Sequence, residues 1–373
     1  MTRNIFLCSV ALATATNVAA QDSSPYISRV FEYRPAPGQY VNVLPKYEEG
    51  DTPETMRAKV EAQLSDNRQE MVSLGAYGGY ITFGFDHMVE NVRGKMDFQI
   101  LGNALYSNSA LYSNSTANPD ASRESGSCEP GIVLVSYDSN ANGEPDDEWY
   151  ELAGSEYGSI ETTHHYSITY YRPDENKEST PKDAFITDDT YVRWTDNLGR
   201  QGYVFRNSFH PQSYYPQWID EDEMAFEGTL LADNYVDESG NGSYYVQYAY
   251  AWGYADNHPN NDDRSKFNIE WAVDDDGNHV DLPGIHFVRV YTGVNQQCGW
   301  IGETSTEVLG ANDLHILGDD TDDRWTTNIH HPSATQTGAD GYYTLGGVPI
   351  STPTRPGIYL RREAGVMKKV LYF

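Results

Sequence analysis

The chain has 373 residues, of which 55 are acidic and 25 are basic, so its formal net charge at pH 7 is −30. A field of this sign repels nucleic acids and anionic lipid surfaces, and we expect neither as a partner. It favours multivalent cations, because these relieve a local excess of carboxylates.

The first twenty residues, MTRNIFLCSVALATATNVAA, combine a basic start at Arg3, a short apolar run and small residues at 18–20. This order is typical of an export signal that is cleaved before Gln21. The apolar run is too short to span a bilayer, and no later segment reaches about 18 uninterrupted apolar residues. We therefore expect a signal peptide at 1–20, no transmembrane segment, and a chain that works outside the cytoplasm.

One helix is expected over residues 54–71. Met56, Val60 and Leu64 are spaced four apart there, and neither Gly nor Pro interrupts the segment. Thr52 is the expected N-cap, with Pro53 at the first helical position.

The rest of the body alternates with period two and is rich in Val, Ile, Tyr and Trp. Asx-Gly turns interrupt this pattern at 196–201, 237–242 and 274–279, where the backbone must adopt positive φ. The sequence therefore predicts an all-β protein with strands at 131–137, 165–172, 190–195, 242–252, 267–273 and 285–293.

Two segments lack the strand pattern. The first, 104–127, contains the hexapeptide ALYSNS twice in tandem and is expected to be a surface loop. The second, 318–340, is acidic and Thr-rich and is expected to be a linker between a body at 25–317 and a small tail at 341–373. Cys128 and Cys298 remain after the signal peptide, and they could form one disulfide or stay unpaired.

Acidic and amide side chains crowd the segment YDSNANGEPDDEWYEL, residues 137–152. Counted from Asp138, side-chain oxygens at positions 1, 3, 5 and 9, with Gly143 at position 6, follow the spacing of a calcium loop. Trp149 stands where the bidentate acid belongs, and the β context excludes a helix-loop-helix hand. Asx-Gly runs also form turns without a metal. We expect Ca²⁺ here, with a plain turn as the alternative. The expected ligands are Asp138, Asn140, Asn142, Glu144 through its backbone carbonyl, Asp146 and Glu148.

A second candidate site lies in the segment SFHPQSYYPQWIDEDE, residues 208–223, where Pro211 and Pro216 interrupt any strand ladder. Aromatic faces beside carboxylates and amides suit a polyhydroxylated ligand, which needs apolar stacking and directed hydrogen bonds. Packing in an aromatic core is the alternative. The expected ligand-binding residues are Tyr214, Tyr215 and Trp218.

Catalytic signals are weak, and no catalytic residue is assigned. Glu129 and Glu303 are the best candidates for a pair of hydrolytic carboxylates, and the GxSxG pattern of a nucleophilic serine is absent. His164 and His165 show no partner at zinc-like spacing. A further acidic cluster at 256–263 has the atoms of a ligand set without a recognised spacing.

The ending of the chain differs in charge and pattern from the body. It reads GYYTLGGV, then RPGIY, then KKVLYF, within residues 341–373. This order resembles the C-terminal sorting tail of proteins exported by the type IX secretion system of Bacteroidota. The resemblance implies a small β tail that engages the secretion machinery and directs passage across the outer membrane.

The body also resembles a known group. DFQILGNA (97–104), EPGIVLVSYD (129–138), WGYADNHPNND (252–262) and LPGIHFVRVYTG (282–293) resemble segments of secreted and cell-surface β-sandwich proteins of Bacteroidota. The resemblance implies a jelly-roll-like β-sandwich with long loops and a small C-terminal β tail, displayed on the cell surface. It implies no particular reaction.

Together these observations predict an extracellular, surface-displayed, non-catalytic binding or structural module. Its expected ligand is a polysaccharide or a small nutrient, captured beside an outer-membrane transporter. If the tail is not functional, the expected location is the periplasm. The alternative is a polysaccharide-acting hydrolase that uses paired carboxylates.

Overall fold

The computed structural model describes residues 23–106, 125–324, 341–343, 349–350, 357–363 and 366–372. The chain divides into two compact units between Asp323 and Arg324, and each is described here by itself. The predicted signal peptide at 1–20, the second hexapeptide and residues 325–340 of the predicted linker lie outside the described residues.

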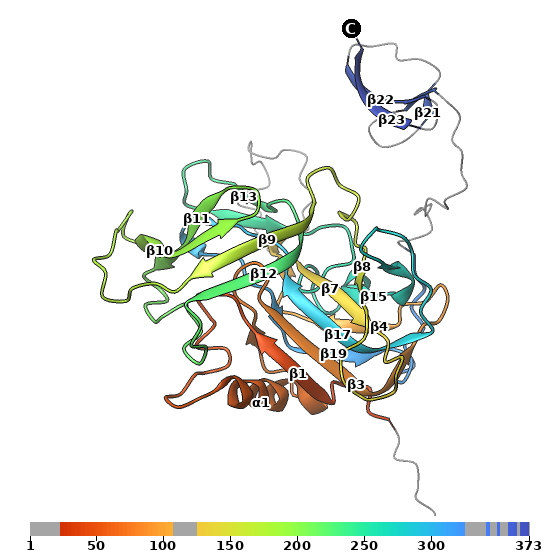
Figure 1. The fold of residues 1–373 in the computed structure, drawn as a ribbon, viewed down its shortest axis with the longest axis horizontal. Helices are drawn as coiled ribbons and strands as arrows, with labels where there is room; N and C mark the ends of the chain where they lie inside the picture. The colour runs from red at the N-terminus through yellow and green to blue at the C-terminus, as the bar shows by residue number, and fades with distance from the viewer. Residues whose placement is uncertain are drawn as a thin grey trace, which may run out of the picture. The chain divides into compact units, whose positions relative to one another are not determined.

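The larger unit is built from strands, so the predicted all-β class is confirmed (Figure 1). Its largest sheet has six antiparallel strands in the order β1 (Arg29–Arg34), β3 (Tyr80–Glu90), β17 (Gly284–Thr292), β7 (Gly131–Ser136), β8 (Trp149–Leu152) and β16 (Ala272–Val273). A four-stranded sheet has the order β11 (Gln201–Asn207), β10 (Ile186–Asp196), β9 (Thr163–Tyr171) and β12 (Glu223–Leu230).

Three smaller sheets complete the described part of this unit. Their strands are β13 (Tyr235–Asp237), β14 (Tyr245–Tyr248), β6 (Ser125–Ser127) and β5 (Leu105–Tyr106); β15 (Lys266–Phe267), β4 (Phe98–Leu101) and β19 (Gly310–Asp313); and β18 (Glu307–Val308) with β2 (Val72–Ser73). This set of separate sheets is propeller-like rather than the jelly-roll-like sandwich that the resemblance implied.

The helix α1 (Pro53–Leu64) begins where predicted, because the Thr52 hydroxyl accepts a hydrogen bond from the amide of Thr55. It ends earlier than predicted, since a 3-10 turn (Ser65–Asn67) with positive φ at Asp66 follows it. The helix runs beside β1 (Figure 1). Glu61 accepts a hydrogen bond from the Val30 amide at 2.9 Å, so α1 covers part of the edge of the largest sheet.

Two predicted strands are shorter than their patterns. Of residues 242–252, only β14 forms a strand. Within 267–273, a 3-10 turn (Ile269–Trp271) separates β15 from β16, because the Asn268 side chain accepts from the amide of Glu270 and turns the backbone. Two further 3-10 turns span Asp263–Ser265 and Gly299–Ile301.

The start of the predicted linker belongs to the larger unit. Asp319 forms a 2.8 Å ion pair with Lys266, and Asp323 accepts a 2.8 Å hydrogen bond from the side chain of Asn268. Residues 318–323 are therefore held to the body, contrary to a linker that begins at 318. Their carboxylates find donors on the body surface, which composition alone did not reveal.

The smaller unit contains one antiparallel sheet in the order β21 (Pro349–Ile350), β20 (Gly341–Tyr343), β22 (Gly357–Glu363) and β23 (Val366–Tyr372). Both body cysteines, Cys128 and Cys298, are buried, and no disulfide joins them to each other. Among the described residues, no helix combines the length and apolar character needed to cross a membrane.

Candidate functional site

The floor of the candidate site is a row of side chains that crosses the largest sheet. Cross-strand neighbours in an antiparallel sheet point to the same face. The register therefore aligns six residues from six strands on one face, in the order Glu32, Thr82, Arg289, Leu134, Glu151 and Val273.

Arg289 is fixed at the centre of this row. Its Nε donates to the Thr82 hydroxyl at 2.9 Å, and its terminal nitrogen forms a 2.5 Å ion pair with Glu32. The guanidinium carbon also lies 4.8 Å from the ring centre of Tyr80 and 4.6 Å from that of Trp149. The positive charge is thus compensated, and both rings are held on the floor of the site.

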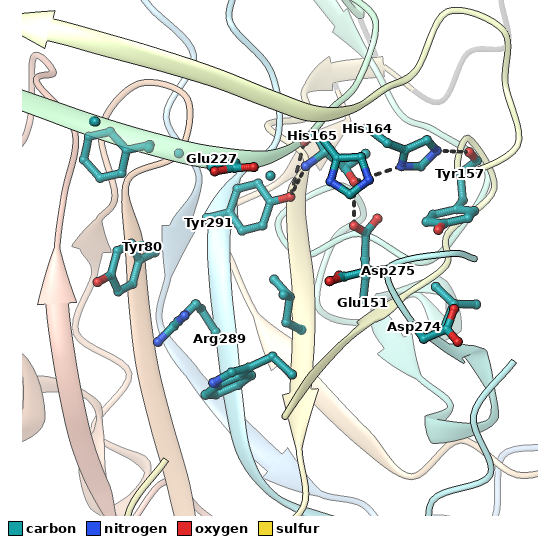
Figure 2. A pocket seen from close by; sticks show the side chains of 18 of the residues that line it. Tyr80, Glu151, Tyr157, His164, His165, Glu227, Asp274, Asp275, Arg289 and Tyr291 are labelled. Atoms are coloured by element: carbon teal, nitrogen blue, oxygen red, sulfur yellow. Dashed lines mark hydrogen bonds between the residues drawn. The ribbon is translucent and has the colours of Figure 1, made fainter. Parts of the chain in front are cut away.

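A wall from the second sheet converts this floor into a pocket of about 400 Å³ (Figure 2). The wall consists of β12 residues 225–229 and the start of β9, while Tyr157 and the segment after β16 close one end. Aromatic and acidic groups together line the space: Tyr80, Trp149, Tyr157, Glu151, Glu227, Asp274 and Asp275.

Tyr291 joins the floor to the wall. Its hydroxyl accepts a 2.7 Å hydrogen bond from the Thr229 amide, and a Cβ at Gly228 would lie only 2.5 Å from the Tyr291 hydroxyl oxygen. Glycine at position 228 is therefore required for this close approach. The contact fixes the separation of the two sheets at the base of the pocket.

A chain of hydrogen bonds connects Glu151 on the floor to His164 on the wall. The Thr229 hydroxyl lies 2.6 Å from Oε2 of Glu151 and 3.2 Å from Nδ1 of His164. Nε2 of His164 lies 3.1 Å from the carbonyl oxygen of Tyr157. A carbonyl only accepts, so Nε2 carries a proton.

This proton count restricts the remaining groups. With one hydroxyl proton between them, Glu151 and His164 can both be hydrogen-bonded only if one of them supplies a second proton. The Thr229 hydroxyl therefore links the Glu151 carboxyl group on the floor to the His164 imidazole on the wall.

The carboxyl groups of the pocket differ in their ionisation. Burial raises the pKa of Glu151 to about 7, and the hydrogen bond from Thr229 opposes part of this rise. At the pocket end, a hydrogen bond from the Asn278 side chain lowers the pKa of Asp274. Near neutral pH the pocket therefore offers one carboxyl group that readily holds a proton and another that stays ionised.

His165 at the rim has a φ of +53°, which L-residues with a side chain rarely adopt. Its carbonyl accepts a 2.8 Å hydrogen bond from the side chain of Asn197, which holds the conformation. The imidazole lines the pocket as a result (Figure 2). Strained residues of this kind are concentrated at ligand sites.

The predicted calcium loop is exposed and brings four of its six expected ligands together. Asp146 accepts from the side chains of Asn140 at 3.2 Å and Asn142 at 3.1 Å. Asp138 accepts from the amides of Asn142 and Gly143, at 3.1 and 2.9 Å. These bonds close the loop as a set of Asx turns.

The two expected glutamate ligands of this loop point to other partners. The Glu144 side chain pairs with Arg29 at 3.2 Å, although its carbonyl was the group expected to bind the metal. Glu148 accepts a 2.9 Å hydrogen bond from the hydroxyl of Tyr150 on β8.

The predicted aromatic binding residues are core residues. Tyr214, Tyr215 and Trp218 have exposed fractions of 0%, 1% and 5%. The Asn42 side chain donates to the carbonyls of Ser213 and Tyr215, at 2.6 and 3.0 Å. An irregular segment can be buried when its backbone groups find such partners, so the prolines broke the strand without exposing the rings.

The two glutamates considered as a catalytic pair do not line the pocket. Glu303 is 4% exposed, and its Oε1 accepts a 2.6 Å hydrogen bond from the amide of Gln39. Burial raises the pKa of Glu303 to about 8. Glu129 is half-buried and lies just before β7.

Sequence reasoning missed the pocket residues. Strand alternation does place Trp149 and Glu151 on one face of β8, and this signal was available. Their neighbour Arg289 comes from a strand far along the chain, and only the register brings it beside them. His164 was considered only as a zinc ligand, which left its contact with Thr229 unforeseen.

The chain was also compared with known proteins. No family model matches it, and the comparison with curated proteins finds no significant match.

Proposed function

We propose that the body is a non-catalytic binding module that captures a neutral polyhydroxylated ligand, such as the end of a glycan, in the pocket between β8, β9, β12 and β17. The observation that supports this proposal is the pairing of aromatic faces with hydrogen-bonding groups on a single floor. Sugars need both: ring faces for their C–H surfaces and directed polar groups for their hydroxyls.

The charges of the pocket favour a neutral ligand over an anionic one. Arg289 is paired with Glu32, and Arg34, also at the pocket, is paired with Glu221 at 2.7 Å. Glu227, Asp274 and Asp275 are left without a paired cation in the described structure. A phosphate or carboxylate ligand would meet net negative charge, whereas hydroxyl groups can donate to these carboxylates.

The test is a glycan-array screen followed by calorimetry on the purified full-length chain. Trp149→Ala should weaken the binding of any glycan retained, by about tenfold, because one stacking face is lost. Trp194→Ala is the matched control, since Trp194 is a half-buried strand tryptophan outside the pocket. Equal loss in both variants, or retention unaffected by Trp149→Ala, would contradict a pocket-bound glycan.

A hydrolase is the second candidate, favoured by the raised pKa of Glu151 in a pocket where the pKa of Asp274 is lowered. General acid catalysis requires a carboxyl group that holds its proton near the working pH. New reducing ends from a retained glycan, lost in Glu151→Gln, would establish this reaction and overturn the non-catalytic proposal. Retention without product supports the binding module.

We also propose that the loop at 138–148 binds Ca²⁺ through Asp138, Asn140, Asn142 and Asp146. The support is that hydrogen bonds link these residues: Asp146 accepts from the side-chain amides of Asn140 and Asn142, and Asp138 accepts from the backbone amide of Asn142. Calcium tolerates irregular shells of six to eight oxygens, and water and the Glu144 carbonyl can complete the shell. Replacing Asp138 and Asn142 with Ala should abolish calcium binding at this loop.

Finally, we propose that the chain is exported and displayed at the cell surface, with 341–373 engaging the type IX secretion machinery. The support is the residue order of the tail and its separation as a compact unit. Deleting 341–373 should leave the body folded and remove the protein from the surface. A shortened protein that still reaches the surface would contradict the sorting role proposed for residues 341–373.

A further inference from the structure

Three carboxyl groups meet in the interior away from the pocket. They come from Glu129 before β7, Asp256 in the loop before β15, and Glu307 on β18. Each offers one oxygen, and these oxygens all lie within 4.8 Å of one another. Asp256 and Glu307 are each 3% exposed, while Glu129 is half-buried.

Asp256 is held rigidly in this arrangement. Its Oδ1 accepts from the amides of Asn103 and Ala104, both at 2.7 Å, and its Oδ2 accepts from the amide of Glu307 at 2.9 Å. Its φ of +54° is unfavourable for aspartate, and a Cβ at Gly102 would lie 2.4 Å from Oδ1. Close packing and a strained backbone therefore present this carboxylate to the other two.

Glu307 supplies an independent sign of a missing partner. Its Oε1 is buried, yet it has no hydrogen-bond partner among the described residues. Buried polar atoms in folded proteins nearly always have a partner, and leaving one unmatched costs about 1–3 kcal/mol.

The cluster also lacks a positive neighbour. No lysine or arginine in the described ranges lies within ion-pair distance of the three carboxyl groups. Carboxyl groups held together in the interior without a positive neighbour either retain protons or receive a cation.

We propose that Glu129, Asp256 and Glu307 form a buried Ca²⁺ site. The donors are all hard oxygens, which excludes a preference for zinc or copper. Ligands at calcium–oxygen distances of about 2.3–2.6 Å lie at most about 5 Å apart, which covers the observed spacing. Calcium also accepts the irregular set of donors that a strand and two loops provide, whereas Mg²⁺ demands a near-ideal octahedron.

The proposed ion would bind Oε1 of Glu307 or lie beside it, and it would neutralise the repulsion within the cluster. It would also connect three segments distant in sequence: the start of β7, the Asp256 loop and β18. This site is distinct from the exposed loop at 138–148, and its existence does not depend on calcium binding there or on a ligand in the pocket.

The experiment is a calcium titration of the full-length chain after chelation, followed by calorimetry and thermal melting. Glu129→Gln and Glu307→Gln each keep the side-chain shape and remove one charge. Each variant should raise the calcium dissociation constant of the buried cluster by more than about tenfold. Even residues that only hold the ligands of a metal site in place contribute that much to metal affinity. The matched control carries Asp138→Ala and Asn142→Ala in the exposed loop and should retain calcium binding at the buried cluster.

Two results would overturn the proposal. One is wild-type calcium affinity in both glutamine variants. The other is a wild type whose melting is unchanged by calcium while Glu307→Gln melts higher, because the cluster then holds a shared proton instead of an ion. If Glu307→Gln does not fold, Glu129→Gln decides the question alone, since Glu129 lies outside the strands and is only half-buried.

Discussion

Two acid-rich regions of this protein differ in how their hydrogen bonds are completed. In the exposed loop at 138–148, amide donors from the same loop satisfy Asp138 and Asp146, and water reaches the remaining oxygens. In the buried cluster, Asp256 is satisfied by three backbone amides, but Oε1 of Glu307 is not satisfied at all. Similar residues thus form a self-contained turn in one place and an incomplete site in the other.

The spacing of acidic residues in the sequence and their burial in the structure therefore give different information about ion binding. The loop has the spacing of a calcium motif, and it can also stand as a turn without an ion. The cluster has no spacing that a motif could capture, yet its burial makes charge compensation obligatory. Dependence on a ligand is therefore expected to be stronger in the region that the sequence marks less clearly.

The largest expected effect comes from removing the same residue type from each region. In chelator, Asp256→Ala should lower the free energy of unfolding by about 3–6 kcal/mol, because three backbone amides lose their acceptor. Asp138→Ala should cost less than about 1 kcal/mol, since water replaces the lost acceptor. Urea denaturation measures both, and equal costs would show that burial does not distinguish the two regions.

Burial should govern the aromatic segment in the same way. Trp218 is 5% exposed and stacks on Tyr33 with ring centres 6.0 Å apart. Trp218→Ala should cost about 3–5 kcal/mol. Phe209, in the same segment, is 56% exposed, and Phe209→Ala should cost no more than about 1 kcal/mol. A small loss of unfolding free energy in Trp218→Ala would indicate that the Trp218 ring is exposed at the surface.

A smaller effect is expected from the pH dependence of Glu151. Its pKa is about 7 in the folded chain against 4.5 for an ordinary glutamate side chain, so the folded state binds more protons between these values. Stability should therefore fall as pH rises through this window, by on the order of 2 kcal/mol. Glu151→Gln should remove this slope, and unfolding curves at several pH values measure it.

The control for this slope is Glu223→Gln, because Glu223 is exposed at the start of β12. An unchanged slope in Glu151→Gln would show that the other ionisable groups set it. The charged and titratable groups that line the pocket with Glu151 are Arg34, Tyr80, Tyr157, His164, His165, Glu227, Asp274, Asp275, Arg289 and Tyr291.

The smallest effect is that of calcium on the exposed loop, best measured in Glu307→Gln so that the buried cluster contributes little. At ten times the dissociation constant, the ion should add about 1.4 kcal/mol, or a few degrees of melting temperature. Asp138→Ala with Asn142→Ala should remove the shift. Glu148→Ala should retain it, because Glu148 is hydrogen-bonded to Tyr150 instead. Identical melting curves with chelator and with calcium would show that the loop is a turn that does not bind calcium.

The features predicted correctly from sequence are local ones. Thr52 and Pro53 define the start of α1 within one turn of chain, and the Asx-Gly turn at 196–201 connects β10 to β11 as predicted. The end of the helix depended on positive φ at Asp66, which no local pattern announced.

The remaining features depend on contacts between distant residues. The pocket floor exists because Arg289 pairs with Leu134 on one side and Thr82 on the other. The burial of Trp218 depends on a distant residue, because the Asn42 side chain donates to backbone carbonyls of the Trp218 segment. The buried cluster joins Glu129 to Glu307, which also lie far apart in the sequence. Motif spacing describes only residues that are close in the sequence, so it could not predict this cluster.

The position of β17 has a consequence for how the chain emerges during synthesis or export. This strand lies between β3 and β7, so the middle of the largest sheet is supplied after most of the body has already appeared. Until residues 284–292 arrive, the inner edges of β3 and β7 have no neighbour and are open to pairing with other chains. Nascent or truncated forms that stop before β17 should therefore be the most prone to aggregate, and a cell that makes this protein needs to keep such intermediates apart.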